Sequence, residues 1–352
     1  MKITIRKIAE LAGVSRSAVD KVIHNRPGVR PEIRKKVEQI IAETGYVPIH
    51  QQREVETALM PKTVAILMPG RNNAYFRALK QGIDDMTAKL PGLILEYYFC
   101  ESTDIDGVLA ALEFLEHRPV DLFVIRGMRS SVISDKLKQL GKPVIFIDSV
   151  VPDADMVCFI GEDCYQSGRL AASLLGKTVP KDGEIAVISG SPKVPGHKLR
   201  LEGFIDSIRV HRPDIRIVDQ IYSQDQSLIA YERTCSLLDA YPRLCGICNL
   251  AGHAGEIGQA IIDRNRQGSV KLICYNITED IAALLHRGVV EFSISIGPYR
   301  QGQLVAQVVY QYLLQGTAPA KPFIRTPISV ILDENIELFL EDEVGPEKKL
   351  EK

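Results

Sequence analysis

The chain has 352 residues, more than a single hydrophobic core usually serves, and 45% of them are apolar while 25% are charged. No apolar run reaches the roughly eighteen residues that a membrane span needs, so this composition excludes both a membrane-spanning and a largely disordered chain. The first residues, MKITIRKIAELAGV, carry charges at Arg6, Lys7 and Glu10 and therefore lack the apolar core of a signal peptide. We expect a folded cytoplasmic protein with one small domain and one larger, two-lobed domain.

The formal net charge of −1 is unevenly distributed along the chain. Residues 1–53 contain 11 Lys and Arg against 5 Asp and Glu, whereas the rest of the chain contains 32 against 39. A basic segment on an acidic body indicates that the first segment contacts a polyanion.

The seven cysteines are odd in number and mostly lie inside apolar runs, so we expect reduced, buried thiols. Cys245 and Cys248 have C-x-x-C spacing, but no second pair and no paired histidines accompany them. This absence argues against a metal or redox site, and two core side chains are the simpler interpretation.

Residues 1–48 are predicted to form three short helices. Gly13 separates the first two, because a tight turn there needs a residue that tolerates positive φ. Ser15 is placed to cap the second helix, which we expect from about Arg16 to His24, with a third from Pro31 to just before Gly45. The apolar residues at helical spacing in the first two helices are Ile8, Leu11, Val19, Val22 and Ile23.

This order of elements predicts a helix-turn-helix domain whose second helix enters the major groove of DNA. A basic helical face can equally be a solvated surface, but the turn, cap and stop signals together favour DNA binding. The residues expected to reach base edges are Arg16, Ser17, Asp20, Lys21 and His24, beside the small Ala18. The residues expected at the DNA backbone or at the helix cap beside it are Thr4, Ser15, Asn25, Arg30, Arg34 and Lys35.

The segment from Ile5 to Pro48 closely resembles the headpiece of the LacI/GalR family of bacterial repressors. The family pattern A-x-x-A-G-V-S-x-x-T-V-S-R-V-L-N is matched at Ala9, Ala12, Gly13, Val14, Ser15, Val19 and Val22, and its exit G-Y-x-P at Gly45, Tyr46 and Pro48. The departures are Ala18 for Thr, Asp20 for Ser, Lys21 for Arg, and Ile23-His24 for Leu-Asn. Because they lie on the predicted reading helix, the resemblance implies DNA binding but leaves the operator sequence open.

Residues 49–61 are polar without a strong period, which predicts a linker. In the family that the headpiece resembles, this stretch is a hinge helix that places an apolar side chain in the minor groove and kinks the duplex. Its pattern P-N-x-x-A-R-x-L is matched here at Pro48 and Arg53, with the β-branched Val55 in place of the intercalating Leu. Arg53 and Val55 are thus candidate DNA contacts of a weakened hinge, and a plain flexible tether is the alternative.

From Lys62 onward, strand-like apolar runs alternate with amphipathic helices. The runs are TVAILM, LILEYYF, DLFVI, PVIFID, EIAVISG, IRIVDQIY, LCGICNL and VKLICYN. This rhythm predicts an α/β body with two doubly wound parallel sheets and with ligand-contacting loops at the carboxyl ends of the strands. We expect one lobe at about 62–160 and 292–322, a second at about 161–291 and 323–338, and a charged, disordered tail at 339–352.

The body shows no enzymatic signature. No G-x-G-x-x-G or phosphate loop opens a predicted helix, and no Ser-His-Asp or paired-carboxylate arrangement is visible. His253 and Glu256 start a helix after a strand and could suit a metal or a base, but no third ligand accompanies them. We expect no enzyme activity, no catalytic residue, no cofactor and no metal.

Residues 62–338 resemble, through looser motifs, the periplasmic sugar-binding-protein-like effector domain of the same family. Asn73 to Phe76 stand where those domains carry N-P-F-F, Arg200 matches the arginine of R-x-x-G-F, and Asn276 takes the place of an acidic residue. Hydrogen-bonding groups around aromatic rings suit a carbohydrate. The effector-binding residues that the resemblance implies, together with Arg126 after the third strand, are Asn73, Tyr75, Phe76, Arg126, Asp148, Arg200, Asn249, His253, Tyr275 and Asn276.

Three departures from the family concern the same cleft: Ser149 replaces a common Arg, Ile296 a common Gln, and Gly252 stands at the usual Asn-Asp position. Arg71, Arg126 and Arg200 together would favour an anionic group, so a sugar phosphate or sugar acid is an alternative to a neutral sugar.

The resemblance implies an allosteric repressor of carbohydrate-utilisation genes, in which a small sugar, polyol or sugar derivative between the lobes controls operator affinity. It further implies a homodimer, with a tetramer as the alternative, on double-stranded operator DNA and away from the membrane. A transport-type sugar-binding protein is the rival from another class, which the basic headpiece and the missing signal peptide argue against.

Overall fold

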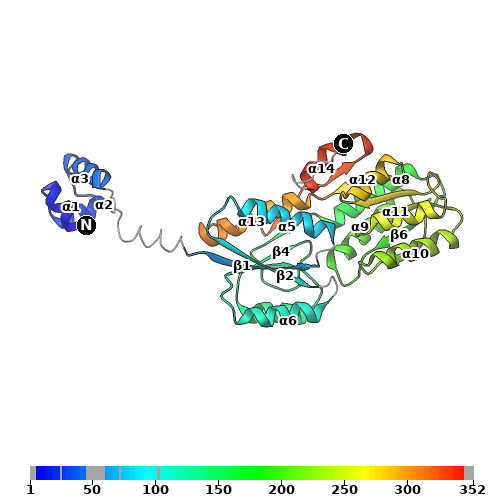
Figure 1. Ribbon diagram of the computed structural model, residues 1–352, viewed down its shortest axis with the longest axis horizontal. Coiled ribbons are helices and arrows are strands. Elements are labelled where there is room, and N and C mark those ends of the chain that lie inside the picture. Colours follow the sequence, from blue (N-terminus) through cyan, green and yellow to red (C-terminus); the bar gives the residue numbers. More distant parts are fainter. Residues whose placement is uncertain (1–4, 24–25, 45–59, 71–72, 101–103, 345–352) are drawn as a thin grey trace. The chain divides into compact units, whose positions relative to one another are not determined.

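The computed structural model describes residues 5–23, 26–44, 60–70, 73–100 and 104–344 (Figure 1). The chain divides into two compact units, Met1–Pro61 and Lys62–Lys352. In these described ranges, no helix is both long enough and apolar enough to cross a membrane.

The smaller unit is built from α1 (Ile5–Ala12), α2 (Arg16–Ile23) and α3 (Pro31–Thr44). Gly13 has a φ of 67°, and the Val14 N–H donates to the Ala9 carbonyl at 3.0 Å, which closes the turn after α1. The Ala18 N–H donates to Ser15 Oγ at 3.2 Å, so the predicted cap of α2 is present.

The three helices share a small apolar core. Its buried members are Ile8, Ala9, Ala12, Val19, Val22 and Val37. Leu11 differs from the pattern seen in the sequence, because it is 49% exposed and faces away from this core. His24, the expected end of α2, lies outside the described residues.

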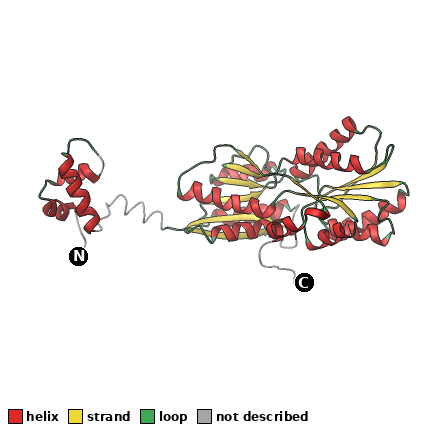
Figure 2. Cartoon of the chain, turned by 90° about the horizontal axis from the view of Figure 1, so that it is seen from above, coloured by secondary structure: helices red, strands yellow, loops and turns green. Residues whose placement is uncertain are grey.

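The larger unit contains two six-stranded sheets, one in each lobe (Figure 2). The first sheet is parallel, in the order β11-β5-β4-β3-β1-β2. Its strands are β1 (Lys62–Pro69), β2 (Leu93–Cys100), β3 (Leu122–Arg126), β4 (Val144–Ile147), β5 (Cys158–Gly161) and β11 (Phe323–Arg325).

The second sheet has the order β12-β10-β9-β8-β6-β7 and is parallel except for β12, which runs antiparallel to β10. Its strands are β6 (Glu184–Ser189), β7 (Arg216–Tyr222), β8 (Leu244–Asn249), β9 (Lys271–Tyr275), β10 (Val290–Ser295) and β12 (Ser329–Ile331). The prediction of an α/β body with two doubly wound, mainly parallel sheets is confirmed.

Helices cover both faces of each sheet. In the first lobe α5 (Ala74–Thr87) and α13 (Pro298–Leu314) pack on one face, and α6 (Ile105–Glu116) and α7 (Ser131–Leu140) on the other. The helices of the second lobe are α8 (Cys164–Thr178), α9 (Pro195–His211), α10 (Ser227–Ala240), α11 (Ala254–Asp263) and α12 (Glu279–His286).

The lobe limits expected from the sequence need two corrections. Residues 292–295 belong to β10, which pairs with β9 of the second sheet, rather than to the first lobe. Residues 323–325 form β11, which covers the edge of β5 in the first sheet, rather than belonging to the second lobe. Both errors arise because a strand joins the sheet whose edge it can pair with, which the apolar pattern of a single strand does not reveal.

The expected disordered tail is wrong for residues 339–344. After a short turn at Asp333–Asn335, the chain forms α14 (Glu337–Val344). Phe339 and Leu340 are partly buried against the core of the second lobe, so an apolar contact orders this segment. Residues 345–352 lie outside the described residues.

Candidate functional site

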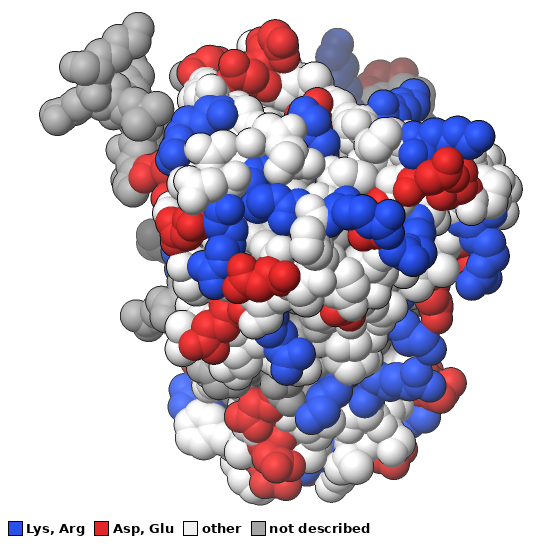
Figure 3. All heavy atoms as spheres, turned by 90° about the vertical axis from the view of Figure 1, so that its right-hand side faces the viewer, with Lys and Arg blue, Asp and Glu red and all other residues white. Residues whose placement is uncertain are grey.

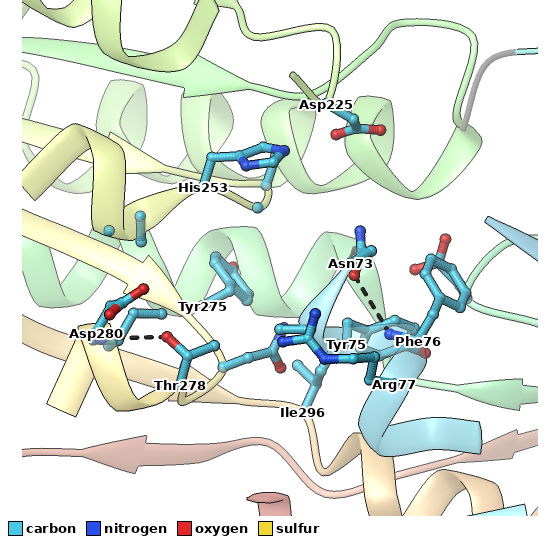
Figure 4. Close-up of a pocket in the computed structure, with 18 of the residues that line it drawn as sticks. Asn73, Tyr75, Phe76, Arg77, Asp225, His253, Tyr275, Thr278, Asp280 and Ile296 are labelled. Carbon is cyan, nitrogen blue, oxygen red and sulfur yellow. Dashed lines mark hydrogen bonds between the residues drawn. The ribbon is translucent and has the colours of Figure 1, made fainter. Parts of the chain in front are cut away.

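A cavity of about 220 Å³ lies between the two lobes, at the carboxyl ends of their strands (Figure 4). A doubly wound topology places ligand-contacting loops at this edge of a sheet. The residues expected from the sequence that line it are Asn73, Tyr75, Phe76, Arg126, Asp148, Arg200, His253, Tyr275 and Asn276. The fold therefore brings together side chains that are more than two hundred positions apart in the sequence.

The start of α5 supplies the aromatic part of the first lobe's wall. Asn73 caps the helix, because its Oδ1 accepts the Phe76 N–H at 3.4 Å (Figure 4). The rings of Tyr75 and Phe76 meet edge to face with centroids 4.8 Å apart. The Tyr75 hydroxyl donates to Gln301 Oε1 at 2.7 Å, which fastens it to α13. Phe76 and the amide nitrogen of Asn73 are the parts of this segment best suited to contact a ligand.

Arg126, at the end of β3, lies between two carboxylates. Its Nε donates to Asp148 Oδ2 at 3.0 Å, and its Nη2 lies 3.9 Å from Asp225 Oδ2. The guanidinium also lies over the Phe76 ring, 5.7 Å from its centroid. Its positive charge is thus balanced inside the cleft.

Arg200, on α9, is held by three contacts. Its Nη1 donates to the Leu250 carbonyl at 2.5 Å, its Nη2 pairs with Glu162, and its guanidinium lies 4.3 Å from the centroid of the Tyr275 ring. The Tyr275 hydroxyl accepts a hydrogen bond from Ser167 at 2.7 Å. Burial opposes charging of Arg200, but Glu162 beside it raises the pKa of the guanidinium, which remains charged.

Glu162 was not singled out in the sequence, although it directly follows β5, where the chain first passes from one lobe to the other. Its side chain is 3% exposed, and that of Arg200 is 6% exposed. The crossing segment thus fixes the orientation of a cleft arginine. No motif in the sequence indicated this role, because the two residues are 38 positions apart.

Asn249, expected from the sequence among the effector-binding residues, is not among the residues that line the cavity. It is fully buried, its Nδ2 donates to the carbonyls of Ala251 and Gly252 at 3.1 and 2.9 Å, and its Oδ1 accepts the Ala251 N–H at 3.3 Å. These bonds shape the loop after β8, so the residue supports the cavity wall without lining it.

His253 lies in this loop with a φ of 64°, and its Nδ1 is 3.7 Å from Glu256 Oε1. The nearby Glu256 carboxylate raises the pKa of His253, and the same contact lowers the pKa of Glu256. Among the described residues, no group of three or more His, Cys, Asp or Glu side chains could hold a metal ion. The seven cysteines, all within the described ranges, are free thiols.

Sequence reasoning missed further polar residues of the cavity wall. They are Arg77, His197, Asp225, Thr278 and Asp280. Asp225 lies in the loop after β7, and His197 lies in the first turn of α9, which follows β6; their position beyond the carboxyl ends of strands was the available signal. Arg71, which suggested an anionic ligand, lies outside the described residues.

The reading helix of the headpiece presents its polar side chains to solvent. Arg16 and Ser17 are exposed, and Asp20 and Lys21 are half-exposed. Asp20 Oδ2 lies 3.7 Å from Nη1 of Arg26, so part of its charge is balanced within the domain.

Arg34 donates from Nη2 to the Arg26 carbonyl at 2.8 Å, and this bond joins α3 to the loop after α2. Arg34 therefore has a structural role in addition to its predicted phosphate contact. Arg30 and Lys35 are exposed. The other expected DNA contacts, Thr4, His24, Asn25, Arg53 and Val55, lie outside the described residues.

The larger unit has no comparable basic face in the view that Figure 3 gives, where Lys and Arg are intermixed with Asp and Glu. Ion pairs are frequent in the second lobe: Glu184 pairs with both Arg216 and Arg243, and Arg264 Nε lies 2.8 Å from Asp239 Oδ1. The excess of Lys and Arg in residues 1–53 makes the headpiece the better candidate for contact with DNA.

Comparison with known proteins finds relatives among bacterial regulators. The chain is 26% identical over 211 residues to the fructose operon regulatory protein of Vibrio cholerae, covering 58% of this chain and 63% of that one. It is 25% identical over 240 residues to catabolite control protein A of Priestia megaterium, covering 66% and 70%. It is 26% identical over 210 residues to the ribose operon repressor of Haemophilus influenzae, covering 58% and 60%. The chain thus matches between 60% and 70% of the length of these relatives.

Solved structures share the fold of the larger unit. A glucose-galactose binding protein from Geobacillus stearothermophilus superposes with a TM-score of 0.71 at 21% identity, covering 78% of this chain and 99% of that one. A solute-binding protein from Burkholderia graminis in complex with D-arabinose gives a TM-score of 0.73 at 21% identity, covering 79% and 97%.

Two family descriptions account for most of the chain. Residues 64–318 match the periplasmic binding protein domain, and residues 4–48 match the bacterial regulatory proteins of the lacI family. The family expected from the sequence is therefore confirmed. The chain belongs to the lacI-type regulatory proteins, with a lacI-family helix-turn-helix domain followed by a periplasmic binding protein domain.

Proposed function

We propose that the protein is a repressor of carbohydrate-utilisation genes that binds operator DNA through α2 and responds to a small neutral sugar bound in the cleft. One observation carries this proposal: a single chain joins a lacI-family DNA-binding domain to a cleft of sugar-binding fold lined by aromatic rings and hydrogen-bonding side chains. The names of its relatives support it, since they include regulators of fructose, ribose and sucrose operons. Its family consists of regulatory proteins, which agrees with the expectation that the chain is not an enzyme.

The charges of the cleft favour a neutral ligand over a sugar acid or phosphate. Arg126 is balanced by Asp148 and Asp225, and Arg200 is balanced by Glu162. An anionic ligand would have to compete with these carboxylates for the same guanidinium groups. The cavity of about 220 Å³ is smaller than the roughly 300–1,000 Å³ of drug-sized ligand sites, which favours a monosaccharide.

We further propose that the protein acts in the cytoplasm as a homodimer, with residues 49–61 joining each headpiece to its effector domain. A dimer places two reading helices on the two halves of a palindromic operator. β2 is an edge strand of the first sheet, and Leu95, Tyr97 and Phe99 on it are only partly buried. This apolar edge is a candidate contact between copies.

Gel-shift titration of the full chain on DNA upstream of its own gene tests the proposal. We expect specific binding at nanomolar protein concentration, and one neutral monosaccharide should change that affinity by about 5–150-fold. Arg16→Ala with Lys21→Ala is the control that should abolish the specific shift. A chain that binds a sugar but no DNA would instead be a transport-type receptor, and the proposal would be wrong.

A further inference from the structure

One acidic side chain of the second lobe reaches the first lobe across the cleft. Asp225 follows β7, and its Oδ2 lies 3.9 Å from Nη2 of Arg126, which ends β3. The two side chains are 8% and 4% exposed, so water screens their attraction poorly. Since Arg126 also binds Asp148 of its own lobe, one buried cation lies between a carboxylate of each lobe.

A strained backbone holds Asp225 in this place. Gln224 and Asp225 have φ values of 54° and 55°, in the left-handed region that residues other than glycine rarely adopt. The Gln224 N–H donates to the Gly190 carbonyl at 3.0 Å, which fixes the turn against the end of β6. Consecutive residues in this conformation cost energy, and such strain is typical of functional sites.

His197 lies beside Asp225, and a hydrogen bond determines which of its ring nitrogens carries the proton. Its Nδ1 accepts the Ser191 N–H at 2.9 Å, so the neutral ring carries its proton on Nε2. A Cβ on Gly190 would lie 2.3 Å from His197 Cε1 and 2.4 Å from Asp225 Oδ1. A glycine at this position therefore lets the imidazole and the carboxylate lie next to each other on the cavity wall.

Resting on the proposed function, we propose that Asp225 and His197 form the specificity-determining pair of the second lobe. The Asp225 carboxylate accepts a hydrogen bond from one hydroxyl group of a neutral sugar. The His197 Nε2–H donates a hydrogen bond to the oxygen of that hydroxyl group. Arg126 fastens Asp225 to the first lobe when the cleft is closed.

A neighbouring acceptor and donor match a sugar hydroxyl, which plays both roles. An acidic ligand group at this position would meet the negative charge of Asp225, and Arg126 already serves two carboxylates. The pair thus selects against sugar acids and couples binding to closure. Figure 4 shows Asp225 and His253 facing Asn73 and Phe76 across the cavity, so a ligand between them touches both lobes.

Two hydrogen bonds donated by backbone N–H groups join the lobes and report closure without any ligand. The Gly196 N–H donates to Ser149 Oγ at 3.1 Å, and the Arg129 N–H donates to the Lys193 carbonyl at 3.2 Å. Opening the cleft breaks both bonds, so the hydrogen exchange of these amides measures the open population.

The first experiment follows this exchange in the full chain by mass spectrometry. Asp225→Asn keeps a residue that tolerates positive φ but removes the charge, and we expect exchange at Gly196 and Arg129 to become about tenfold faster. Asp182→Asn is the matched control, since Asp182 is exposed and has a φ of 57°. Equal exchange in the two variants would overturn the proposal.

The second experiment is calorimetric titration with D-ribose, D-arabinose, D-xylose, D-glucose, D-galactose and D-fructose, and with D-gluconate as the acidic probe. For the sugar that the natural chain binds, Asp225→Asn and His197→Leu should each lower affinity at least about tenfold. His197→Gln, whose amide nitrogen can replace Nε2–H, should stay within about threefold. If His197→Gln binds no better than His197→Leu, the proposed donor is wrong.

The two experiments separate the two proposals. If the natural chain binds none of these neutral sugars, the proposed function fails. The exchange measurement still decides whether Asp225 joins the lobes, because it needs no ligand.

Discussion

The headpiece and the cleft place their functional charges in opposite environments. On α2, Arg16 is exposed and Lys21 half-exposed, in a segment with an excess of positive charge. In the cleft, Arg126 and Arg200 are buried and paired with carboxylates. Exposed charges attract a partner at a distance, and salt screens this attraction. Buried, paired charges act through the positions of their hydrogen-bonding atoms, and salt screens them much less. Under the proposed function, the same residue type would contact a polyanion in the headpiece and a neutral ligand in the cleft.

The largest expected difference between the two regions is in how strongly their binding affinities depend on salt concentration. If the proposed dimer makes about 6–10 phosphate contacts, its DNA affinity should fall by about 10³–10⁵-fold between 50 and 200 mM salt. Sugar affinity should change by less than about twofold, since the cleft charges are paired. Fluorescence anisotropy with labelled DNA and calorimetry with sugar, over the same salt series, measure the two slopes. A steep salt dependence of sugar binding would break the comparison and favour an anionic effector.

Breaking the pair between Glu162 and Arg200 should give the next largest effect. Glu162→Gln leaves a buried guanidinium without its carboxylate, and we expect the free energy of unfolding to fall by about 3 kcal/mol. Urea unfolding of the full chain, followed by the signal of the larger unit, measures it. Glu202→Gln, a change at a 46% exposed side chain, is the control and should cost less than about 0.5 kcal/mol. Equal losses in both variants would show that Glu162 does not hold Arg200.

On the headpiece side, Lys21→Ala should weaken specific operator binding about tenfold while leaving binding to unrelated DNA nearly unchanged. The reason is that a base contact discriminates between sequences, whereas a phosphate contact does not. Lys35→Ala, at an exposed position of α3, is the matched comparison and should weaken both kinds of binding alike. Competition gel shifts with operator and unrelated DNA give the ratio. Equal weakening by Lys21→Ala would make it a phosphate contact.

The two regions also differed in how far the sequence predicted them. In the headpiece, Gly13 and the Ser15 cap act on residues only a few positions away, and both lie where the pattern put them. The family motifs likewise located Phe76 and Arg200 in the cleft. Asp225 could not be found in this way, because its direction depends on two strained φ angles and its partner Arg126 comes from the other lobe. Asn249 was misjudged because a buried amide that shapes a loop and one that binds a ligand look alike in sequence.

The smallest expected effect concerns the ion pair of His253 and Glu256 on the cavity wall. Glu256 raises the pKa of His253 above its ordinary 6.5, so this histidine's contribution to stability is complete below about 6.5 and is lost as pH rises through its pKa in the folded chain. The lowered pKa of Glu256 means that its contribution is present above its ordinary 4.5 and is lost in acid. The pair should therefore stabilise the fold most between about pH 4.5 and 6.5.

His253→Asn tests this, because asparagine tolerates the φ of 64° at this position but cannot be charged. Glu256 is 40% exposed and solvent screens the pair, so the loss should be under about 1 kcal/mol at pH 5.5 and near zero at pH 8.5. Thermal unfolding at both values measures it, with the exposed His211→Asn as the control. A loss that is equal at the two pH values would mean that His253 acts through its shape alone.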